Sequence, residues 1–470
     1  MTTIDRNPRR QTERLVVVLG AGLSKAANNA MPLTDELGEA VRGRLSPEDQ
    51  ARLPHREFGD GYFEQWVSYL AEEQPHLSED RLLEARALLY RVTRAVRDVL
   101  EEAQFQALTA RPPGWLMRLV SVLHFSRATV VNMNYDNLVE CAVEGHTRQR
   151  GADHGYEHRR VTEDDVLCGV PRRADLLRQR DTAARSVAFK PKFVALGTPG
   201  PVRTFRLLKP HGSLSWYSVP GDVTGSTLQR WELPGTFGHP VAQDQQDRQR
   251  ALPGMEPFIV PPAALKGGYL ASAVVRQIWQ WAFQALAEAD RVVLVGYSLP
   301  LADQSFAGML SQALDGRAVP IEVVNLDPGP VLAHLERLGL DADPAHALAG
   351  PSCTQAWVER ETDRQARRLA ERIAQTDELQ GDEAIVVAHR GATERVLSAT
   401  VVGDDFVALL PGEGEQFSGH VGARALLDSL ERVKRVVVSK GEEKLPVVGV
   451  QWTSPTLAQR SLHLIPVGEW

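Results

Sequence analysis

The chain of 470 residues lacks the features that mark secreted, membrane-spanning and zinc-binding proteins. It has three cysteines, Cys141, Cys168 and Cys353, and no C-x-x-C pair, so neither a disulfide framework nor a four-cysteine zinc site is expected. Its longest apolar runs are the length of strands, well short of the ~20 residues that a membrane span needs. Residues 1–14 are polar and have no apolar signal core, which favours a cytoplasmic protein.

An excess of basic charge is also missing, because the formal net charge is −7 at pH 7. Bulk charge therefore gives no argument for nucleic acid binding. The hydrophobic content of 43% and the charged content of 24% are ordinary for a soluble globular protein. The length is sufficient for one large α/β domain and a smaller second one.

Apolar, β-branched runs predict strands at residues 15–19, 128–131, 292–295 and 321–325. Helical periodicity dominates residues 33–120, which predicts a helical insertion between the first two of these strands. Further helices are expected around residues 278–286 and 304–315. Strands that alternate with helices predict an α/β fold with a Rossmann-like parallel sheet.

The pattern changes along the chain, which predicts more than one domain. Residues 1–350 are expected to form the α/β domain, residues 351–380 a connecting helix, and residues 381–470 a small β-rich domain. Glycines separate the short strand-like runs of this last part, which one helical piece at residues 422–432 interrupts. Residues 145–200 are expected to form loops and short strands, and residues 243–250 a polar loop.

A glycine turn follows the first predicted strand directly. Gly20, Ala21 and Gly22 come straight after residues 15–19, and Ser24 follows two residues later. Two glycines let a backbone approach a pyrophosphate without a Cβ in the way, and the N-terminus of the next helix attracts anions. The dehydrogenase fingerprint has a third glycine that this turn lacks, so the turn by itself is a weak indication.

Three later segments strengthen this interpretation. They are Asn132-Met133-Asn134-Tyr135-Asp136, Lys209-Pro210-His211-Gly212-Ser213-Leu214-Ser215-Trp216, and Gly296-Tyr297-Ser298 with Asp303 shortly after. With the glycine turn, they resemble the motifs of sirtuin-like NAD-consuming enzymes, in particular the bacterial antiphage-defence branch. That branch carries G-A-G-x-S, T-x-N-Y-D, K-L-H-G-S-x-N-W and G-Y-S in this order. The match covers about residues 15–330.

The resemblance implies a sirtuin-like fold and an NAD⁺ hydrolase that releases nicotinamide and ADP-ribose. It implies that residues 1–350 form the NAD-binding catalytic domain, with Asn134 and His211 as catalytic residues. The residues that it implies for binding the cofactor are Gly20, Ala21, Gly22, Ser24, Asp136, Gly296, Ser298 and Asp303, and the strand end at Asn325 and Asp327 lies where the adenosine ribose is expected. In this chain Asn132 replaces the Thr of the family, Pro210 replaces a Leu and Ser215 replaces an Asn.

The chemistry supports these roles independently. Cleavage of the nicotinamide–ribose bond passes through an oxocarbenium-like state, as glycoside cleavage does, and needs a positioned water and a base. A histidine such as His211 has the near-neutral pKa that a base requires, and the amide of Asn134 can hold the water or a ribose hydroxyl. Structural alternatives stay open, because His211 and Asn134 also suit turns, Asp136 also suits a loop anchor and Ser298 also suits a helix N-cap.

The resemblance also suggests a biological setting. By this resemblance the enzyme is expected to deplete NAD⁺ on phage infection. A homo-oligomer, a partner ATPase or nuclease of a defence system and a phage-derived trigger are expected as partners. No zinc is expected, which favours hydrolysis over protein deacylation. Two alternatives remain: an NAD-dependent deacylase or ADP-ribosyltransferase, and a non-catalytic NAD- or ADP-ribose-binding subunit of a defence complex. The small β-rich domain is then a candidate sensor or docking module.

Overall fold

The computed structural model describes residues 13–54, 57–59, 62–72, 74–148, 170, 204–220, 222, 225–241, 252–260, 272–374, 384–389, 392–412, 421–430, 432–453 and 461–467. Contacts between Cα atoms divide the chain into two units. The first consists of Met1–Pro112, Arg127–Cys141 and Glu163–Thr354, and the second of Pro113–Ser126, Ala142–Thr162 and Gln355–Trp470. Most of the loops predicted at 145–200, and the whole polar loop predicted at 243–250, lie outside the described residues.

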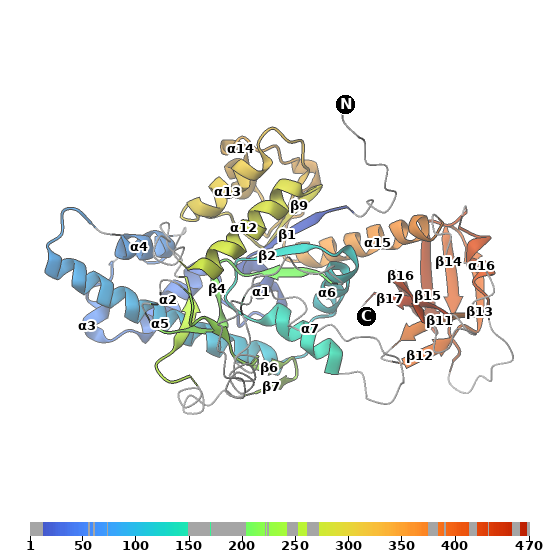
Figure 1. The fold of residues 1–470 in the computed structure, drawn as a ribbon, viewed down its shortest axis with the longest axis horizontal. Helices are drawn as coiled ribbons and strands as arrows, with labels where there is room; N and C mark the ends of the chain where they lie inside the picture. Colours follow the sequence, from blue (N-terminus) through green and yellow to red (C-terminus); the bar gives the residue numbers. More distant parts are fainter. Residues whose placement is uncertain are drawn as a thin grey trace, which may run out of the picture. The chain divides into compact units, whose positions relative to one another are not determined.

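A five-stranded parallel sheet forms the centre of the first unit (Figure 1). Its strands are β1 (Leu15–Leu19), β2 (Thr129–Asn132), β3 (Arg206–Leu208), β9 (Arg291–Val295) and β10 (Ile321–Val324), in the order β10-β9-β1-β2-β3. Every neighbouring pair is parallel. All residues of β1, β9 and β10 are buried, as expected for a parallel sheet that is covered on both faces. The predicted α/β class with a Rossmann-like parallel sheet is thus confirmed.

The strand order places a topological switch point beside β1. From β1 the chain continues outward to β2 and β3, and then returns to the other side of β1 with β9 and β10. In doubly wound sheets of this kind, ligands bind outside the carboxyl ends of the strands at such a point. Three-residue β3 was missed from the sequence, because a run this short gives no periodic signal.

The chain between β1 and β2 is helical, and its helices after the first one form the insertion predicted at residues 33–120. The helices are α1 (Ala21–Ala27), α2 (Thr34–Arg44), α3 (Pro47–Gln50), α4 (Tyr62–Ala71), α5 (Glu79–Thr109) and α6 (Gly114–Ser126), of which α6 belongs to the second unit. The helices α2, α4 and α5 pack on one another around a core that contains Phe58, Phe63 and Trp66. The same core also contains Leu138, Leu214 and Ile259, so the insertion packs against the rest of the first unit.

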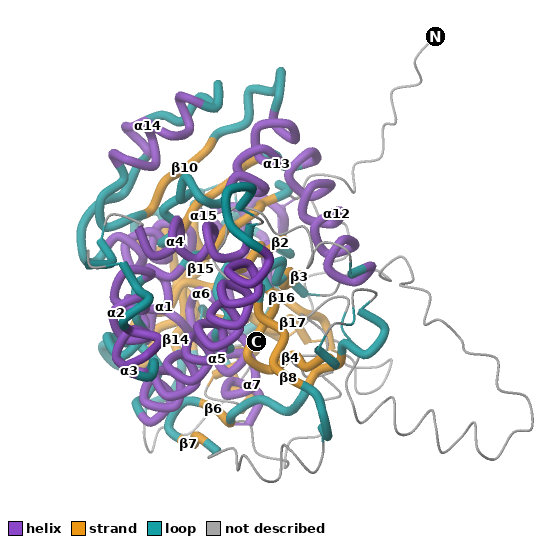
Figure 2. The backbone as a smooth tube through the Cα atoms, turned by 90° about the vertical axis from the view of Figure 1, so that its left-hand side faces the viewer, coloured by secondary structure: helices purple, strands orange, loops and turns teal. Residues whose placement is uncertain are grey.

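The remaining helices of the first unit follow the later strands. They are α7 (Leu138–Arg148, which runs on into the second unit), α12 (Ala273–Glu288), α13 (Gln304–Leu314), α14 (Gly329–Arg337) and the 3₁₀ helix η1 (Pro344–His346). Figure 2 shows α12 and α13 side by side, and α12 also contacts β2 and β3. A small antiparallel sheet of β4 (Gly212–Ser218), β5 (Gln229–Arg230) and β8 (Glu256–Ile259) continues from β3, and β6 (Gly235–Thr236) pairs with β7 (His239–Pro240).

The second unit contains a seven-stranded sheet, as predicted for a β-rich C-terminal part. The strands are β11 (Ala384–His389), β12 (Ala392–Arg395), β13 (Ser398–Val402), β14 (Asp405–Leu409), β15 (Arg435–Lys440), β16 (Glu443–Thr453) and β17 (Ser461–Pro466), in the order β12-β11-β17-β16-β15-β14-β13. The pairs β11–β17 and β14–β15 are parallel and the other pairs are antiparallel. The sequence did not predict β17.

Two helices contribute to this second unit. The long helix α15 (Cys353–Ala374) places Leu369 and Ile373 in the apolar core of the β-rich sheet, and Gln365 donates to the carbonyl of Val122 in α6 at 2.7 Å. The helix predicted at residues 422–432 is shorter, because α16 spans only Arg424–Leu427. The residues that follow continue as turns whose backbone N–H groups bond three residues back, as in the bond from Ser429 to Leu426.

Candidate functional site

The predicted site residues lie at one edge of the parallel sheet. Each follows the carboxyl end of a strand: Gly20, Ala21, Gly22 and Ser24 after β1; Asn134 and Asp136 after β2; His211 after β3; Gly296, Ser298 and Asp303 after β9; and Asn325 and Asp327 after β10. Because all five strands are parallel, their carboxyl ends share one edge. Segments up to about 300 residues apart in sequence are thus brought to one place.

The two glycine turns contact each other through their backbones. The N–H of Gly20 donates to Val295 O at 3.1 Å, and the N–H of Gly22 donates to Gly296 O at 2.9 Å. A Cβ on Gly20 would lie 2.5 Å from the Tyr297 Cα, and one on Gly22 would lie 2.8 Å from the Gly296 Cα. The contact of these two turns is therefore one reason for glycine at both positions. The φ of +58° at Gly296 adds a second reason at that position.

Asn134 is buried and firmly held. Its Nδ2 donates to Gly20 O and to Ser24 Oγ, both at 2.9 Å, so the residue after β2 is bound to the turn after β1. The backbone N–H of Asn134 donates to Asn132 Oδ1 at 3.1 Å. The substitution of Asn132 for the Thr of the resembled motif thus supplies a side-chain acceptor that fixes the next-but-one residue.

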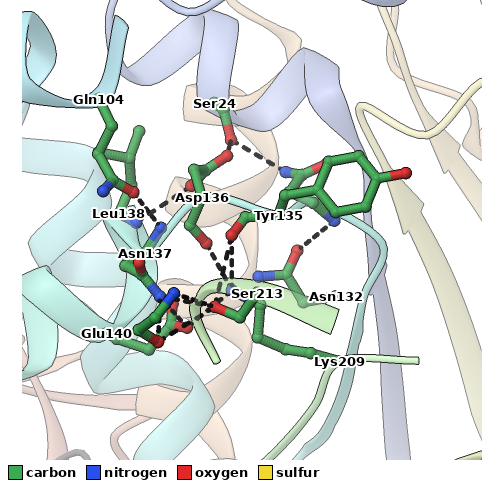
Figure 3. A network of polar contacts seen from close by, with 12 residues as sticks. Ser24, Gln104, Asn132, Tyr135, Asp136, Asn137, Leu138, Glu140, Lys209 and Ser213 are labelled. Carbon is green, nitrogen blue, oxygen red and sulfur yellow. Dashed lines mark hydrogen bonds and ion pairs between the residues drawn. The ribbon is translucent and has the colours of Figure 1, made fainter. Parts of the chain in front are cut away.

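Ser24 and Asp136 continue this network. The Ser24 hydroxyl, which accepts from Asn134, donates to Asp136 Oδ2 at 2.7 Å, and Asp136 Oδ1 accepts from the N–H of Leu138 at 3.1 Å (Figure 3). Burial raises the pKa of Asp136 above its usual value, although the charge of Lys209 and these hydrogen bonds oppose the shift. Both side chains are buried, 3% exposed for Ser24 and 4% for Asp136. Through these contacts Ser24 and Asp136 hold the side chain of Asn134 in place.

A buried ion pair adjoins this network, and the sequence analysis assigned it no role. Lys209 Nζ lies 2.8 Å from Glu140 Oε1, and both side chains are 0% exposed. The same Nζ donates to the carbonyl of Asp136 at 2.5 Å and contacts that of Tyr135 at 3.4 Å (Figure 3). The signal for this pair was a lysine directly after the apolar run 207–208, since a lysine next to a buried strand needs a partner.

His211 lies against a buried carboxylate. Its Nε2 is 3.7 Å from Asp303 Oδ2, the oxygen that also accepts the Tyr297 hydroxyl at 2.7 Å. Burial, together with the nearby Asp303, raises the pKa of Tyr297 well above its ordinary value, so the phenol stays protonated and remains a donor. Asp303 was predicted to bind the cofactor, and the structure places it next to His211.

The backbone around His211 is also fixed. The carbonyl of His211 accepts from Val260 at 2.8 Å, and that of Pro210 accepts from Trp279 Nε1 at 3.3 Å. The rings of Tyr135 and Trp279 lie with their centroids 6.4 and 6.1 Å from that of His211. The carbonyl of Pro210, which replaces a Leu of the resembled motif, thus accepts a hydrogen bond directly before His211.

The other predicted cofactor residues are more exposed. Ser298 and Asp327 are exposed, and Ala21 and Asn325 are half-buried. Asn325 Nδ2 donates to Tyr297 O at 3.3 Å, and Asp327 Oδ1 accepts from the N–H of Gly329 at 3.0 Å, where α14 begins. The two side chains after β10 thus take part in local turns.

Within the described ranges, no group of three or more His, Cys, Asp or Glu side chains is arranged to hold a metal ion. Among the helices that the structure describes, none combines the length and the apolar character needed to cross a bilayer.

Among known proteins, the chain is similar to several solved structures. No family model matches the chain, and no curated protein matches its sequence. A structure described under "Structural Basis for the Mechanism and Regulation of Sir2 Enzymes" aligns at a TM-score of 0.35 and 14% identity, over 77% of this chain and 94% of the other. A Sir2 homolog–NAD complex aligns at 0.33 and 13%, over 75% and 90%. Sir2Tm bound to a propionylated peptide aligns at 0.31 and 12%, over 74% and 94%. These Sir2 structures are what the chain is similar to.

Proposed function

We propose that this chain is an NAD⁺ hydrolase that cleaves the nicotinamide–ribose bond and releases nicotinamide and ADP-ribose. One observation carries the proposal: Asn134 and His211, chosen from two separate sequence motifs, follow adjacent parallel strands, and buried hydrogen bonds join the loops that carry them. A base and an amide that lie at neighbouring strand ends are what the hydrolysis of a glycosidic bond to a neutral leaving group requires.

The proposed reaction needs no external acid. The bond between C1′ of the ribose and the nicotinamide nitrogen breaks, and the electron pair leaves with neutral nicotinamide. A water oxygen bonds to C1′ and His211 takes the proton of that water. Asp303, 3.7 Å from Nε2, then stabilises the imidazolium that forms. Because both N–H bonds of the Asn134 amide point to Gly20 and Ser24, its Oδ1 is the atom that we assign to the water or a ribose hydroxyl.

The dinucleotide is proposed to lie across the switch point between β1 and β9. Gly20, Ala21 and Gly22 are assigned to one side of the pyrophosphate. The exposed Ser298 is assigned to the phosphate or ribose, and the turn with Asn325 and Asp327 to the adenosine ribose. These assignments are supported by the shared edge of the sheet.

Hydrolysis is favoured over protein deacylation by the cysteine count. Deacetylating sirtuins usually carry a four-cysteine zinc module, and this sequence has three cysteines in all. The acceptor assigned here is accordingly water. An abortive-infection role in phage defence, a homo-oligomeric assembly, a partner ATPase or nuclease and a phage-derived trigger are proposed on the motif resemblance alone.

The second unit is proposed as the control module, since all the cofactor-type motifs lie in the first. Truncating the chain at about residue 375, to remove the β-rich sheet, is a poor test of this control role. Leu369 and Ile373 of α15 pack in the core of that sheet. A shortened chain would expose these side chains to water. Control is better tested in the full-length protein with surface substitutions on the second unit.

The test is incubation of the purified full-length protein with NAD⁺, followed by chromatography of the products. Free ADP-ribose and nicotinamide in equal amounts support the hydrolase. ADP-ribose attached to protein, or an acyl-ADP-ribose formed with an acylated peptide, would replace it with a transferase or a deacylase. Binding of NAD⁺ without any turnover would leave a non-catalytic subunit as the function.

A further inference from the structure

We infer that the buried Lys209–Glu140 ion pair holds the loop of His211 in register with the loop of Asn134, which makes Lys209 a positioning residue for the cleavage reaction. The inference rests on the function proposed above. The sequence motif placed Lys209 two residues before His211, and it assigned no role to Glu140.

The lysine connects the two loops directly. Lys209 stands in the loop that carries His211, and its Nζ bonds to the carbonyls of Asp136 at 2.5 Å and Tyr135 at 3.4 Å. These carbonyls belong to the two residues that follow Asn134. One ammonium group thus attaches the segment before the proposed base to the segment after the proposed amide.

A second attachment lies on the other side of His211. Ser213, two residues after it, places its Oγ 3.4 Å from the Tyr135 carbonyl, and the N–H of Leu214 donates to the same carbonyl at 2.9 Å. Asn137 Nδ2 donates to Ser213 Oγ at 2.8 Å and to Glu140 Oε1 at 3.1 Å (Figure 3). His211 is therefore fixed between two points that both contact the Tyr135 carbonyl.

The chemistry of the pair fits a positioning role better than a stabilising one. Replacing a buried ion pair by apolar side chains of similar volume often leaves stability unchanged or raises it, because two charges no longer have to be desolvated. The apolar replacement loses the directional hydrogen bonds that fix the two loops. An ammonium group offers three donors, and here the three acceptors are Glu140 Oε1 and two main-chain carbonyls. A shift of about 1 Å between catalytic groups is enough to cost about 10² in rate.

The test replaces the pair by apolar residues of similar length, in the double variant Lys209→Met with Glu140→Leu. We expect kcat for NAD⁺ cleavage to fall by about 10², with the KM and the thermal midpoint close to those of the wild type. Glu140→Gln keeps an acceptor for Lys209 and is expected to retain most of the turnover. If the turnover per mole of total protein falls only in proportion to the loss of folded protein, the inference is overturned.

The matched control is the buried pair of Arg291 and Glu322, whose Nη1 and Oε1 lie 3.0 Å apart with side chains 3% and 6% exposed. Arg291 Nε also lies 3.2 Å from Glu13 Oε1, a side chain that is 19% exposed. Arg291 begins β9 at the opposite edge of the same sheet, away from the strand ends that carry the site. Arg291→Met with Glu322→Leu is expected to leave kcat unchanged.

A milder variant covers the case in which the double variant does not fold. Ser213→Ala removes one contact on the far side of His211 and is expected to lower kcat several-fold while KM holds. Wild-type kcat in this variant and in any folded form of the double variant would overturn the inference.

A separate readout distinguishes failure of the inference from failure of the proposed function. If the wild type does not cleave NAD⁺, the function proposed above is wrong and positioning is judged on the His211 imidazole signals in ¹⁵N-histidine NMR. These signals should change in the double variant and stay unchanged in the control. Identical signals in all three proteins would overturn the positioning role.

Discussion

His211 Nε2 and Asp303 Oδ2 lie 3.7 Å apart, and that same oxygen accepts the hydroxyl of Tyr297. The separation is too long for a hydrogen bond and short enough for an ion pair once the imidazole is protonated. Because the Tyr297 pKa is raised well above its ordinary value, the phenol remains a donor to Asp303 throughout the range in which a histidine titrates. The carboxylate thus lies between a permanent donor and the proposed base.

Asp303→Asn is expected to move the acid limb of the pH profile of kcat/KM to lower pH, by about one unit. The sign follows from charge, since an ionised Asp303 favours the protonated imidazole and its neutral replacement does not. Tyr297→Phe should move the limb the other way, because the carboxylate loses a competing donor. A profile that coincides with the wild type in both variants would show that Asp303 does not act on His211.

Gly22→Ala is expected to destabilise the protein, by about 1–3 kcal/mol, because its Cβ would lie 2.8 Å from the Gly296 Cα and 2.9 Å from the Gly296 carbonyl oxygen. The matched control is Gly43→Ala, where a Cβ in α2 meets nothing within 4 Å. Gly43→Ala is expected to gain about 0.5–1 kcal/mol from helix propensity. Urea unfolding of both variants checks this. Equal stability of the two would contradict the close approach of the turns.

Asp136→Asn is expected to change how stability depends on pH. Because burial raises the pKa of Asp136, the folded state holds this proton more tightly than the unfolded state. The wild type therefore loses free energy of unfolding as pH rises from about 3.9, the ordinary Asp value, through the raised value, and Asp136→Asn does not. Urea unfolding from about pH 4 to about pH 8 measures the difference. Parallel curves for the two proteins would count against the raised pKa.

Asn134→Ala is expected to lower kcat by about 10²–10⁴, because the amide that holds the water is lost. It should also cost about 1–3 kcal/mol of stability, since Gly20 O and Ser24 Oγ lose their donor. Turnover must therefore be measured below the unfolding transition. Asn325→Ala, which changes an amide after β10, is expected to raise KM with a smaller effect on kcat. A large loss of kcat in Asn325→Ala, with mainly a raised KM in Asn134→Ala, would contradict the roles assigned to these two residues.

The sequence was sufficient to predict four of the five strands of the parallel sheet. Long buried runs such as residues 15–19 and 292–295 have a clear apolar pattern, and glycine or asparagine marks the point where each strand ends. It was not sufficient for β3, with three residues, or for β17 (Ser461–Pro466). Short strands are stabilised by their neighbours in the sheet, which a local pattern does not contain.

The sequence also left out how the site residues contact one another. The sequence does not show that the backbone of Gly22 contacts that of Gly296. It also does not show that Asp303 lies next to His211. The pairing of Lys209 with Glu140 joins residues 69 positions apart. Such contacts depend on the arrangement of strands in space, so that motif spacing alone does not define them.

The most direct test of the central claim is the rate of nicotinamide release from NAD⁺ by the full-length wild type and by His211→Ala, measured under identical conditions and with unfolding curves for both. The account predicts release with equal free ADP-ribose in the wild type, and a rate lower by about 10²–10⁴ in a folded His211→Ala protein. Wild-type release from folded His211→Ala would contradict the account.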